Sequence, residues 1–270
     1  LMNHRKAHLL AYQNEALVAR FEALVQRSVD VEAKLRVLAK LSPASPLDAL
    51  DSIDTRPLAA AVARYFSKLL AYKDEYEVAR LHADPLFTAK LNEQFEGDFQ
   101  LRFHLAPPLF AKRDQQGRLL KAEYGPWMMK AFGLLQHFKF LRGTAFDVFG
   151  RSDERRKERA WIERYEASLQ SALQKLEASF DDLASRSRLT EAYQALVVLA
   201  QVPEHIRGYG HVKERHFEDA QSRWQQASDR FAKAFEAELL SSQHPDTASS
   251  QHQVKAQVIE IRRPKASEHA

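Results

Sequence analysis

Apolar residues recur at spacings of three, four and seven along most of the chain, and this period is typical of helices that bury one face. Leu17, Phe21 and Leu24 illustrate it near the N-terminus. The same period predicts long helices near residues 5–40, 56–81, 152–182, 188–202 and 212–240. Pro57 falls in the first turn of the second predicted helix, and Ser152 precedes the third as an N-cap. The chain is therefore expected to be mainly helical.

The centre of the chain departs from this period between about residues 97 and 150, where six of the 8 glycines lie. Residues 99–105 alternate apolar and polar side chains, and residues 118–124 supply a second extended segment. These two segments predict one antiparallel hairpin between about residues 98 and 124. Pro126 then opens a further helix.

Together these patterns predict a mainly α fold, a multi-helix bundle with long helices and a small central β-hairpin. Residues 1–240 would form one helical domain, with the hairpin and the loop-rich region of about 97–150 at its centre. Residues 241–270 are polar and lack a period, so we expect a disordered or loosely packed tail. Helical periodicity from the first residues onward suggests a piece of a longer protein.

The composition narrows the possible chemistry. The sequence contains no cysteine, which excludes disulfides, a thiolate nucleophile and a cysteine-ligated iron–sulfur cluster within this chain. The net charge is +4, but Lys and Arg interleave with Asp and Glu, as in residues 151–159, and this disfavours a nucleic-acid-binding stripe. No apolar run approaches the roughly 20 residues that cross a bilayer, and the N-terminus lacks a signal peptide. We expect a cytoplasmic protein without membrane association.

No motif indicates a catalytic, cofactor-binding or metal site in the chain. Dinucleotide-binding, P-loop, zinc-protease and nucleophile-elbow patterns are missing. His4 and His8 lie four residues apart but lack a third ligand. The candidates for a domain interface or a ligand-facing surface are Arg102, His104, Lys112, Arg142, His211, Lys213 and Arg215.

These candidates also have plainer interpretations. Arg102 and His104 fit the polar face of a two-stranded sheet. Residues 211–216 fit the solvated first turn of a capped helix, where backbone N–H groups could also receive a phosphate or carboxylate. The aromatic-rich segment from Trp127 to Phe149 is either core or a docking surface for another domain.

Five stretches of the sequence, taken together, resemble one known family. They are KLLAYKDEYEVAR at 68–80, FEGDFQLRFHLAPPL at 95–109, GPWMM at 125–129, LRGTAFDVFG at 141–150 and IRGYGHVKER at 206–215. In order and spacing they resemble the C-terminal region of the fused bacterial indolepyruvate ferredoxin oxidoreductases, which are 2-oxoacid:ferredoxin oxidoreductases. The resemblance runs from the first residues to about residue 235.

The resemblance implies a parent enzyme that oxidatively decarboxylates arylpyruvates to aryl-acetyl-CoA and passes electrons to ferredoxin. In that family thiamine diphosphate, magnesium and an iron–sulfur cluster serve the reaction, in domains N-terminal to the region seen here. It therefore implies no catalytic residue and no cofactor in this chain. The implied partners are the N-terminal catalytic domains of the same polypeptide, with ferredoxin and CoA for the parent enzyme, in a homo-oligomer.

Three roles stay open at this stage. The chain is an accessory domain that packs on the catalytic domains or helps assembly, or it covers a ligand or a CoA phosphate through the hairpin and residues 208–215. The third role, a stand-alone helical nucleic-acid-binding module, is disfavoured by the interleaved charges. Glycines, basic residues and aromatics are concentrated in residues 97–150, so we expect the hairpin and the helix that follows it to face the catalytic domains.

Overall fold

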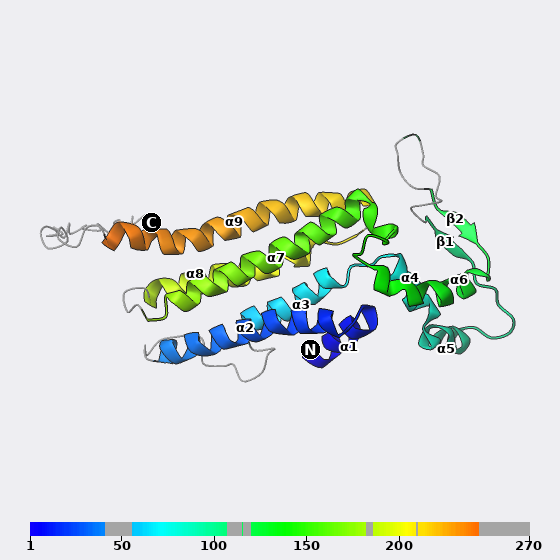
Figure 1. The fold of residues 1–270 in the computed structure, drawn as a ribbon, viewed down its shortest axis with the longest axis horizontal. Helices are drawn as coiled ribbons and strands as arrows, with labels where there is room; N and C mark the ends of the chain where they lie inside the picture. Colours follow the sequence, from blue (N-terminus) through cyan, green and yellow to red (C-terminus); the bar gives the residue numbers. More distant parts are fainter. Residues whose placement is uncertain (41–55, 107–114, 116–119, 182–185, 209, 243–270) are drawn as a thin grey trace, which may run out of the picture.

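The protein is described by a computed structural model that covers residues 1–40, 56–106, 115, 120–181, 186–208 and 210–242. Within these residues the fold is mainly α with one small sheet, as the sequence predicts (Figure 1). The α-helices are α1 (Met2–Tyr12), α2 (Glu15–Lys40), α3 (Pro57–Leu70), α4 (Glu75–Ala83), α5 (Pro85–Gln94), α6 (Met128–Leu135), α7 (Asp153–Ala178), α8 (Arg186–Gln201) and α9 (Gly210–Ser242). The other elements are strands β1 (Phe103–Leu105) and β2 (Ala122–Tyr124) and the 3-10 helices η2 (Gln136–Leu141), η3 (Phe149–Arg151) and η5 (Val202–His205).

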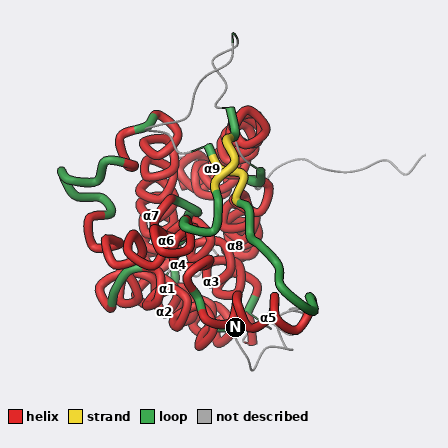
Figure 2. The backbone as a smooth tube through the Cα atoms, turned by 90° about the vertical axis from the view of Figure 1, so that its right-hand side faces the viewer, coloured by secondary structure: helices red, strands yellow, loops and turns green. Residues whose placement is uncertain are grey.

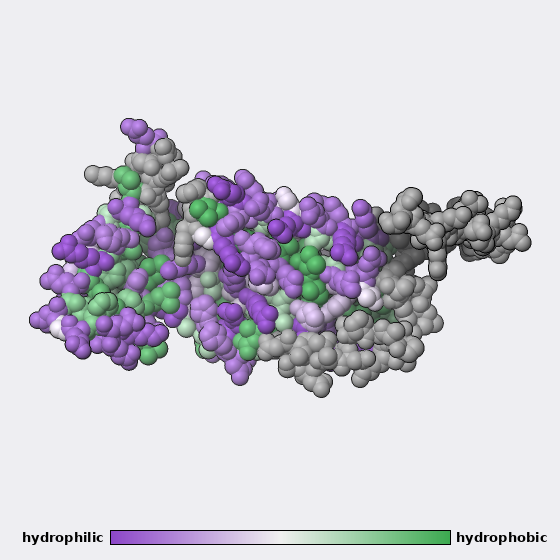
Figure 3. Space-filling view, turned by 180° about the vertical axis from the view of Figure 1, so that it is seen from behind, coloured by the Kyte–Doolittle hydropathy of each residue, from purple (hydrophilic) through white to green (hydrophobic). Residues whose placement is uncertain are grey.

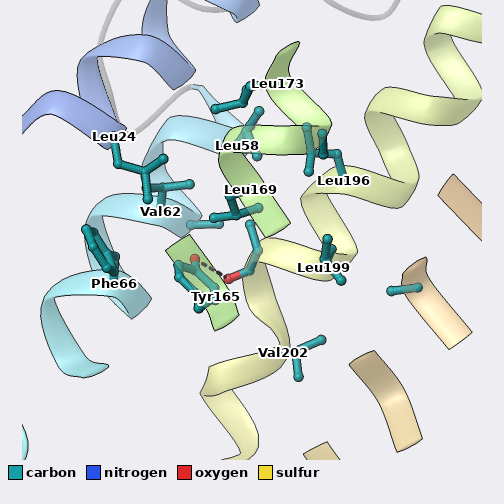
Figure 4. Close-up of a cluster of buried hydrophobic side chains, with 14 of the residues drawn as sticks. Leu24, Leu58, Val62, Phe66, Tyr165, Leu169, Leu173, Leu196, Leu199 and Val202 are labelled. Carbon is teal, nitrogen blue, oxygen red and sulfur yellow. Dashed lines mark hydrogen bonds between the residues drawn. The ribbon is translucent and has the colours of Figure 1, made fainter. Parts of the chain in front are cut away.

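The main bundle consists of α1, α2, α3, α7, α8 and α9, whose apolar faces share one large core. Its long helices run side by side along the longest axis of the molecule (Figure 1). Tyr165 of α7 is fully buried near the centre, and its ring stacks on Phe66 of α3 with 5.8 Å between centroids. Its hydroxyl donates a 2.9 Å hydrogen bond to the carbonyl oxygen of Ala200 (Figure 4), which satisfies the polar group inside the core.

The small lobe consists of α4, α5, β1, β2, α6 and η2, and it lies at one end of the bundle (Figures 1 and 2). Its core is a separate cluster formed by Ala79, Phe103, Met128 and Phe132. β1 and β2 pair antiparallel, and Phe103 lies opposite Tyr124. The predicted hairpin is thus confirmed, with strands shorter than expected, and part of its connection lies outside the described residues.

The first two predicted helices are each divided into two. The side chain of Asn14 accepts a 3.0 Å hydrogen bond from the Leu17 N–H, so a new helix, α2, begins after α1. Asp74 accepts a 2.9 Å hydrogen bond from the Glu77 N–H and caps α4 in the same way. Ser152 caps α7, as predicted.

The later helices agree with the sequence pattern. α7, α8 and α9 occupy the segments predicted near 152–182, 188–202 and 212–240. α9 extends to Ser242, and residues 243–270, where a loosely packed tail is predicted, lie outside the described part of the chain. None of the described helices combines the length and apolar character needed to span a bilayer.

Candidate functional site

Arg142, predicted to lie on an interface, is buried within the chain. Only 6% of its side chain is exposed, and its guanidinium binds Asp74 through two hydrogen bonds of 2.5 and 2.9 Å. It also donates to the carbonyl oxygen of Tyr12 at 2.7 Å and lies 3.7 Å from the centre of that ring. Burial opposes the charged form, but the hydrogen bond with Asp74 raises the pKa of Arg142. Arg142 therefore joins η2 to α1 and to the start of α4, and the surface role expected of it needs correction.

Glu77 and Asp147 continue this junction between bundle and small lobe. Burial alone would raise the pKa of Glu77, but hydrogen bonds from Arg80 and His8 overcome it and lower the pKa to about 2. Asp147 accepts 2.9 Å hydrogen bonds from the N–H groups of Gly143 and Gly150 and so closes the loop before α7. These carboxylates are bound within the chain and serve its architecture.

The hairpin candidates lie on one exposed face of the sheet. Arg102 precedes β1 and pairs with Glu123 of β2 at 2.5 Å, with 64% of the arginine side chain exposed. His104 is also exposed and lies opposite Glu123 in the ladder, while Phe103 between them points into the small core. The structure therefore brings Arg102 and His104 together on a polar sheet face. Lys112 lies outside the described residues.

The turn before α9 borders a pocket of about 260 Å³. Gly208 takes a positive φ of 86° there, which glycine adopts without strain. Lys213 binds the buried Glu158 of α7, and Lys68 donates to the carbonyl oxygens of Pro203 and Glu204 at 2.9 and 3.2 Å. Burial lowers the pKa of Lys68, and the nearby positive charge of Arg207 lowers it further.

This pocket is better suited to packing than to ligand binding. Its volume falls below the range of roughly 300–1,000 Å³ usual for ligand sites, and two of the lysines that line it, Lys68 and Lys213, are bound to groups of the chain itself. Arg215 is exposed on α9, and the side chain of His211 lies outside what the structure describes. The pocket thus lies between α3, α7 and the start of α9, next to the contact that Lys213 makes with α7.

α6 presents an uncovered apolar face. Its sequence, MMKAFGLL, contains one charged residue, Lys130. Met128 and Phe132 are buried in the small core, whereas 65% of Leu134 is exposed. A helix that is apolar on all sides is usually buried on all sides. One apolar face of α6 is therefore exposed to solvent, although the sequence of α6 is typical of a helix buried on all sides.

Exposed apolar side chains are concentrated in and just after the small lobe. Of the 16 large apolar side chains exposed in the described residues, 11 lie between Leu81 and Val148. Figure 3 shows hydrophobic atoms at the surface of this part of the molecule. The most exposed of them, here called the exposed apolar set, are Leu86 (68%), Trp127 (60%), Leu134 (65%), Phe140 (64%) and Phe146 (76%). Such concentrations of apolar side chains mark interaction sites.

The aromatic-rich segment from Trp127 to Phe149 includes the three aromatic members of the exposed apolar set, whereas Leu86 and Leu134 were not singled out from the sequence. Of the basic candidates in residues 97–150, Arg102 is paired with Glu123 and Arg142 is buried. The signal for Leu134 was the all-apolar sequence of α6 itself, which exceeds what one buried face requires. Among the described residues no group of three or more His, Cys, Asp or Glu is placed to hold a metal ion.

Fold and surface together define a helical bundle domain with a small lobe that exposes apolar side chains to solvent. The chain belongs to a family of unknown function, DUF6537, whose family model matches residues 1–226. Comparison with curated proteins and with solved structures gave no match.

Proposed function

We propose that this chain is a non-catalytic accessory domain of an indolepyruvate ferredoxin oxidoreductase and that its exposed apolar set packs on the catalytic domains of the same polypeptide. The parent enzyme oxidatively decarboxylates arylpyruvates to aryl-acetyl-CoA and passes electrons to ferredoxin. Thiamine diphosphate, magnesium and the iron–sulfur cluster belong to other domains in this proposal. The assembled enzyme is a cytoplasmic homo-oligomer, and this chain contributes to its assembly.

The observation that carries the proposal is the uncovered face of α6. Leu134, and Phe140 in the 3-10 helix that follows, are each about two-thirds exposed, at 65% and 64%. Phe140 stacks on Phe138 with 6.1 Å between ring centroids, so the aromatic side chains contact one another and leave one side to solvent. Burying such side chains against another domain removes apolar area from water, which favours association. The resemblance of the sequence to the oxidoreductase family is the reason why we propose the catalytic domains of the same polypeptide as the partner.

The competing role, a cover over a ligand, has less support at the place where it was expected. The pocket beside Gly208 is small, and its cations Lys68 and Lys213 are bound to groups of the chain itself. A ligand there would have to displace hydrogen bonds that the chain already makes. The assembly role requires no such exchange.

The reading frame that encodes the chain gives the first check, because it should continue upstream into a thiamine diphosphate-binding sequence. In the full-length polypeptide, Leu134→Ser with Phe140→Ser should lower assembly and indolepyruvate-dependent reduction of ferredoxin. Central apolar interface residues cost on the order of 1–2 kcal/mol each when truncated. Size-exclusion chromatography and the ferredoxin assay measure the two effects.

Val198→Ser is the matched control, since Val198 is an exposed apolar residue on α8 of the bundle. It should leave assembly and activity unchanged. The double variant should also leave the thermal unfolding of the isolated chain nearly unchanged, because both side chains are exposed. Normal assembly and activity in the double variant would contradict the proposed docking.

A further inference from the structure

A second cavity, of about 410 Å³, lies between the loop before α7 and the first turns of α7. The loop contributes Gly143, Asp147, Gly150 and Arg151 to its lining, and α7 contributes Arg156 and Arg159. Its volume lies within the range usual for ligand sites, unlike that of the pocket beside Gly208. Neither the assembly role nor the sequence candidates account for this cavity.

The charges around this cavity are strongly unequal. Three arginines line it, and Asp147 is the one carboxylate in the lining. Asp147 is buried, and its two oxygens already accept hydrogen bonds from the N–H groups of Gly143 and Gly150. Asp147 therefore stabilises the loop. Among the described residues it forms no salt bridge with any of the three arginines. The cavity keeps an excess of positive charge.

The arginines that line the cavity have more N–H donors than the hydrogen bonds they make within the described residues. Arg151 donates to the carbonyl oxygen of Ala145 at 3.0 Å, and Arg159 donates through Nη2 to that of Gly150 at 2.6 Å. Each guanidinium has five N–H donors. The Arg159 side chain also interacts with Tyr72, where it opposes the rise that burial causes in the pKa of that tyrosine, and its Nη1 is shielded from solvent.

Arg156 can bind an anion in the cavity without losing a strong ion pair. It pairs with Asp153 one turn earlier on α7, but the two side chains are 67% and 81% exposed. Exposed ion pairs of this kind contribute little to stability, so a bound anion can replace Asp153 as the partner of Arg156. Gly150 completes the geometry, because a Cβ there would overlap the Asp147 carboxylate and lie 2.9 Å from Arg159 Nη1. The close approach of loop and arginine thus requires glycine.

We propose that this cavity binds a phosphorylated small molecule through its phosphate group, held by Arg151, Arg156 and Arg159. One guanidinium satisfies a carboxylate through two parallel hydrogen bonds, whereas several guanidiniums around one cavity suit a dianion that carries three or more acceptor oxygens on a single atom. Three arginines in one lining therefore favour phosphate over carboxylate. The site shares its loop with Phe146 of the exposed apolar set, but it is tested on this chain alone.

The test is calorimetric titration of the 270-residue chain with inorganic phosphate, with pyrophosphate and with succinate as the carboxylate control. We expect one of the two phosphates to bind at submillimolar concentration and succinate to bind at least about tenfold more weakly. Arg151→Gln with Arg156→Gln should weaken phosphate binding by more than about tenfold, since both residues are exposed and the fold is kept. Arg223→Gln, an exposed arginine on α9, should bind as the wild type does.

Arg159→Lys provides a second variant, because it keeps the charge while removing the planar fork. It should also weaken phosphate binding, with the helical circular dichroism of the wild type retained. Absence of phosphate and pyrophosphate binding at millimolar concentration would overturn the proposal. Equal weakening in Arg223→Gln, or succinate binding as tight as phosphate binding, would overturn it as well. All of these readouts are independent of assembly and of ferredoxin reduction, so the two proposals fail separately.

Discussion

At the scale of single residues, Glu32 of α2 determines how α3 begins. Its side chain is 3% exposed and accepts hydrogen bonds from the N–H groups of Leu58 and Ala59 at 2.8 and 3.0 Å and from the Tyr193 hydroxyl at 2.5 Å. The N-cap residue of α3, Arg56, makes no capping bond with its own side chain. A carboxylate from another helix thus binds the positive end of α3.

Glu32→Ala should lower the free energy of unfolding by about 3 kcal/mol, because it leaves buried N–H groups and a buried hydroxyl without an acceptor. Urea unfolding followed by circular dichroism measures the change. Glu22→Ala, on the same helix, removes an exposed pair with Lys6 and should cost less than about 1 kcal/mol. Equal losses in the two variants would show that Glu32 does not cap α3.

Arg142 and Arg102 should respond very differently to replacement by alanine. Arg142→Ala leaves the buried Asp74 carboxylate without its partner, and breaking such a pair costs about 3–5 kcal/mol. Arg102→Ala removes an exposed pair with Glu123 and should cost less than about 1 kcal/mol. Thermal unfolding of both variants checks the contrast. A stable Arg142→Ala variant would contradict the structural role assigned to this arginine.

The residue scale is also where the sequence was least informative. Arg142 lies in a glycine-containing segment with basic neighbours and was expected at a surface, but its partner Asp74 is 68 residues earlier in the chain. Glu32 likewise acts on residues 26 and 27 positions away. Periodicity reports which face of an element is buried, and it carries no signal for polar contacts between distant elements.

At the scale of elements, α7, α8 and α9 were predictable because each keeps one apolar face along its length. The break between α3 and α4 was not predicted, because apolar spacing continues across it through Tyr72 and Tyr76. The signal that could have located it is local: Asp74 followed three residues later by Glu77 has the form of a capping box. The strands of the hairpin were overestimated, since their length depends on pairing in space.

His82 of α4 also makes the stability of the small lobe depend on pH. Its ring stacks on Phe132 at 5.0 Å between centroids and meets Phe103 edge-on at 5.4 Å. Burial lowers the pKa of His82, and the positive charge of Lys73 lowers it further. In the unfolded chain His82 is protonated below its ordinary pKa of 6.5, whereas in the folded chain it is protonated only at a lower pH. The free energy of unfolding therefore decreases as the pH falls from about 6.5 towards the lowered pKa.

His82→Phe should remove this loss between about pH 6.5 and the lowered pKa of the folded state, because the replaced ring takes no proton. Chemical unfolding at a series of pH values measures it. His104→Gln, on the exposed side of β1, should keep the pH dependence of the wild type. An unchanged slope in His82→Phe would assign the dependence to another group.

At the scale of the whole molecule, the bundle and the small lobe differ in how completely they bury their apolar residues. The bundle encloses one large core, whereas the small lobe has a core of four buried residues and most of the exposed apolar side chains. The sequence predicted that this region would face a partner, and that prediction stays a proposal. What it could not supply was which aromatic and apolar side chains of the segment from Trp127 to Phe149 are buried and which are exposed, because this depends on how the segment packs on the small core.

The most direct measurement of the central claim is hydroxyl-radical footprinting of side chains in the isolated chain and in the full-length polypeptide. In the isolated chain Trp127, Phe140 and Phe146 should be oxidised readily, because 60%, 64% and 76% of them is exposed. In the full-length polypeptide the account predicts strong protection of these side chains, with Leu10 and Val198 of the bundle as reactive as before. Equal reactivity of the exposed apolar set in both forms would contradict docking through the small lobe.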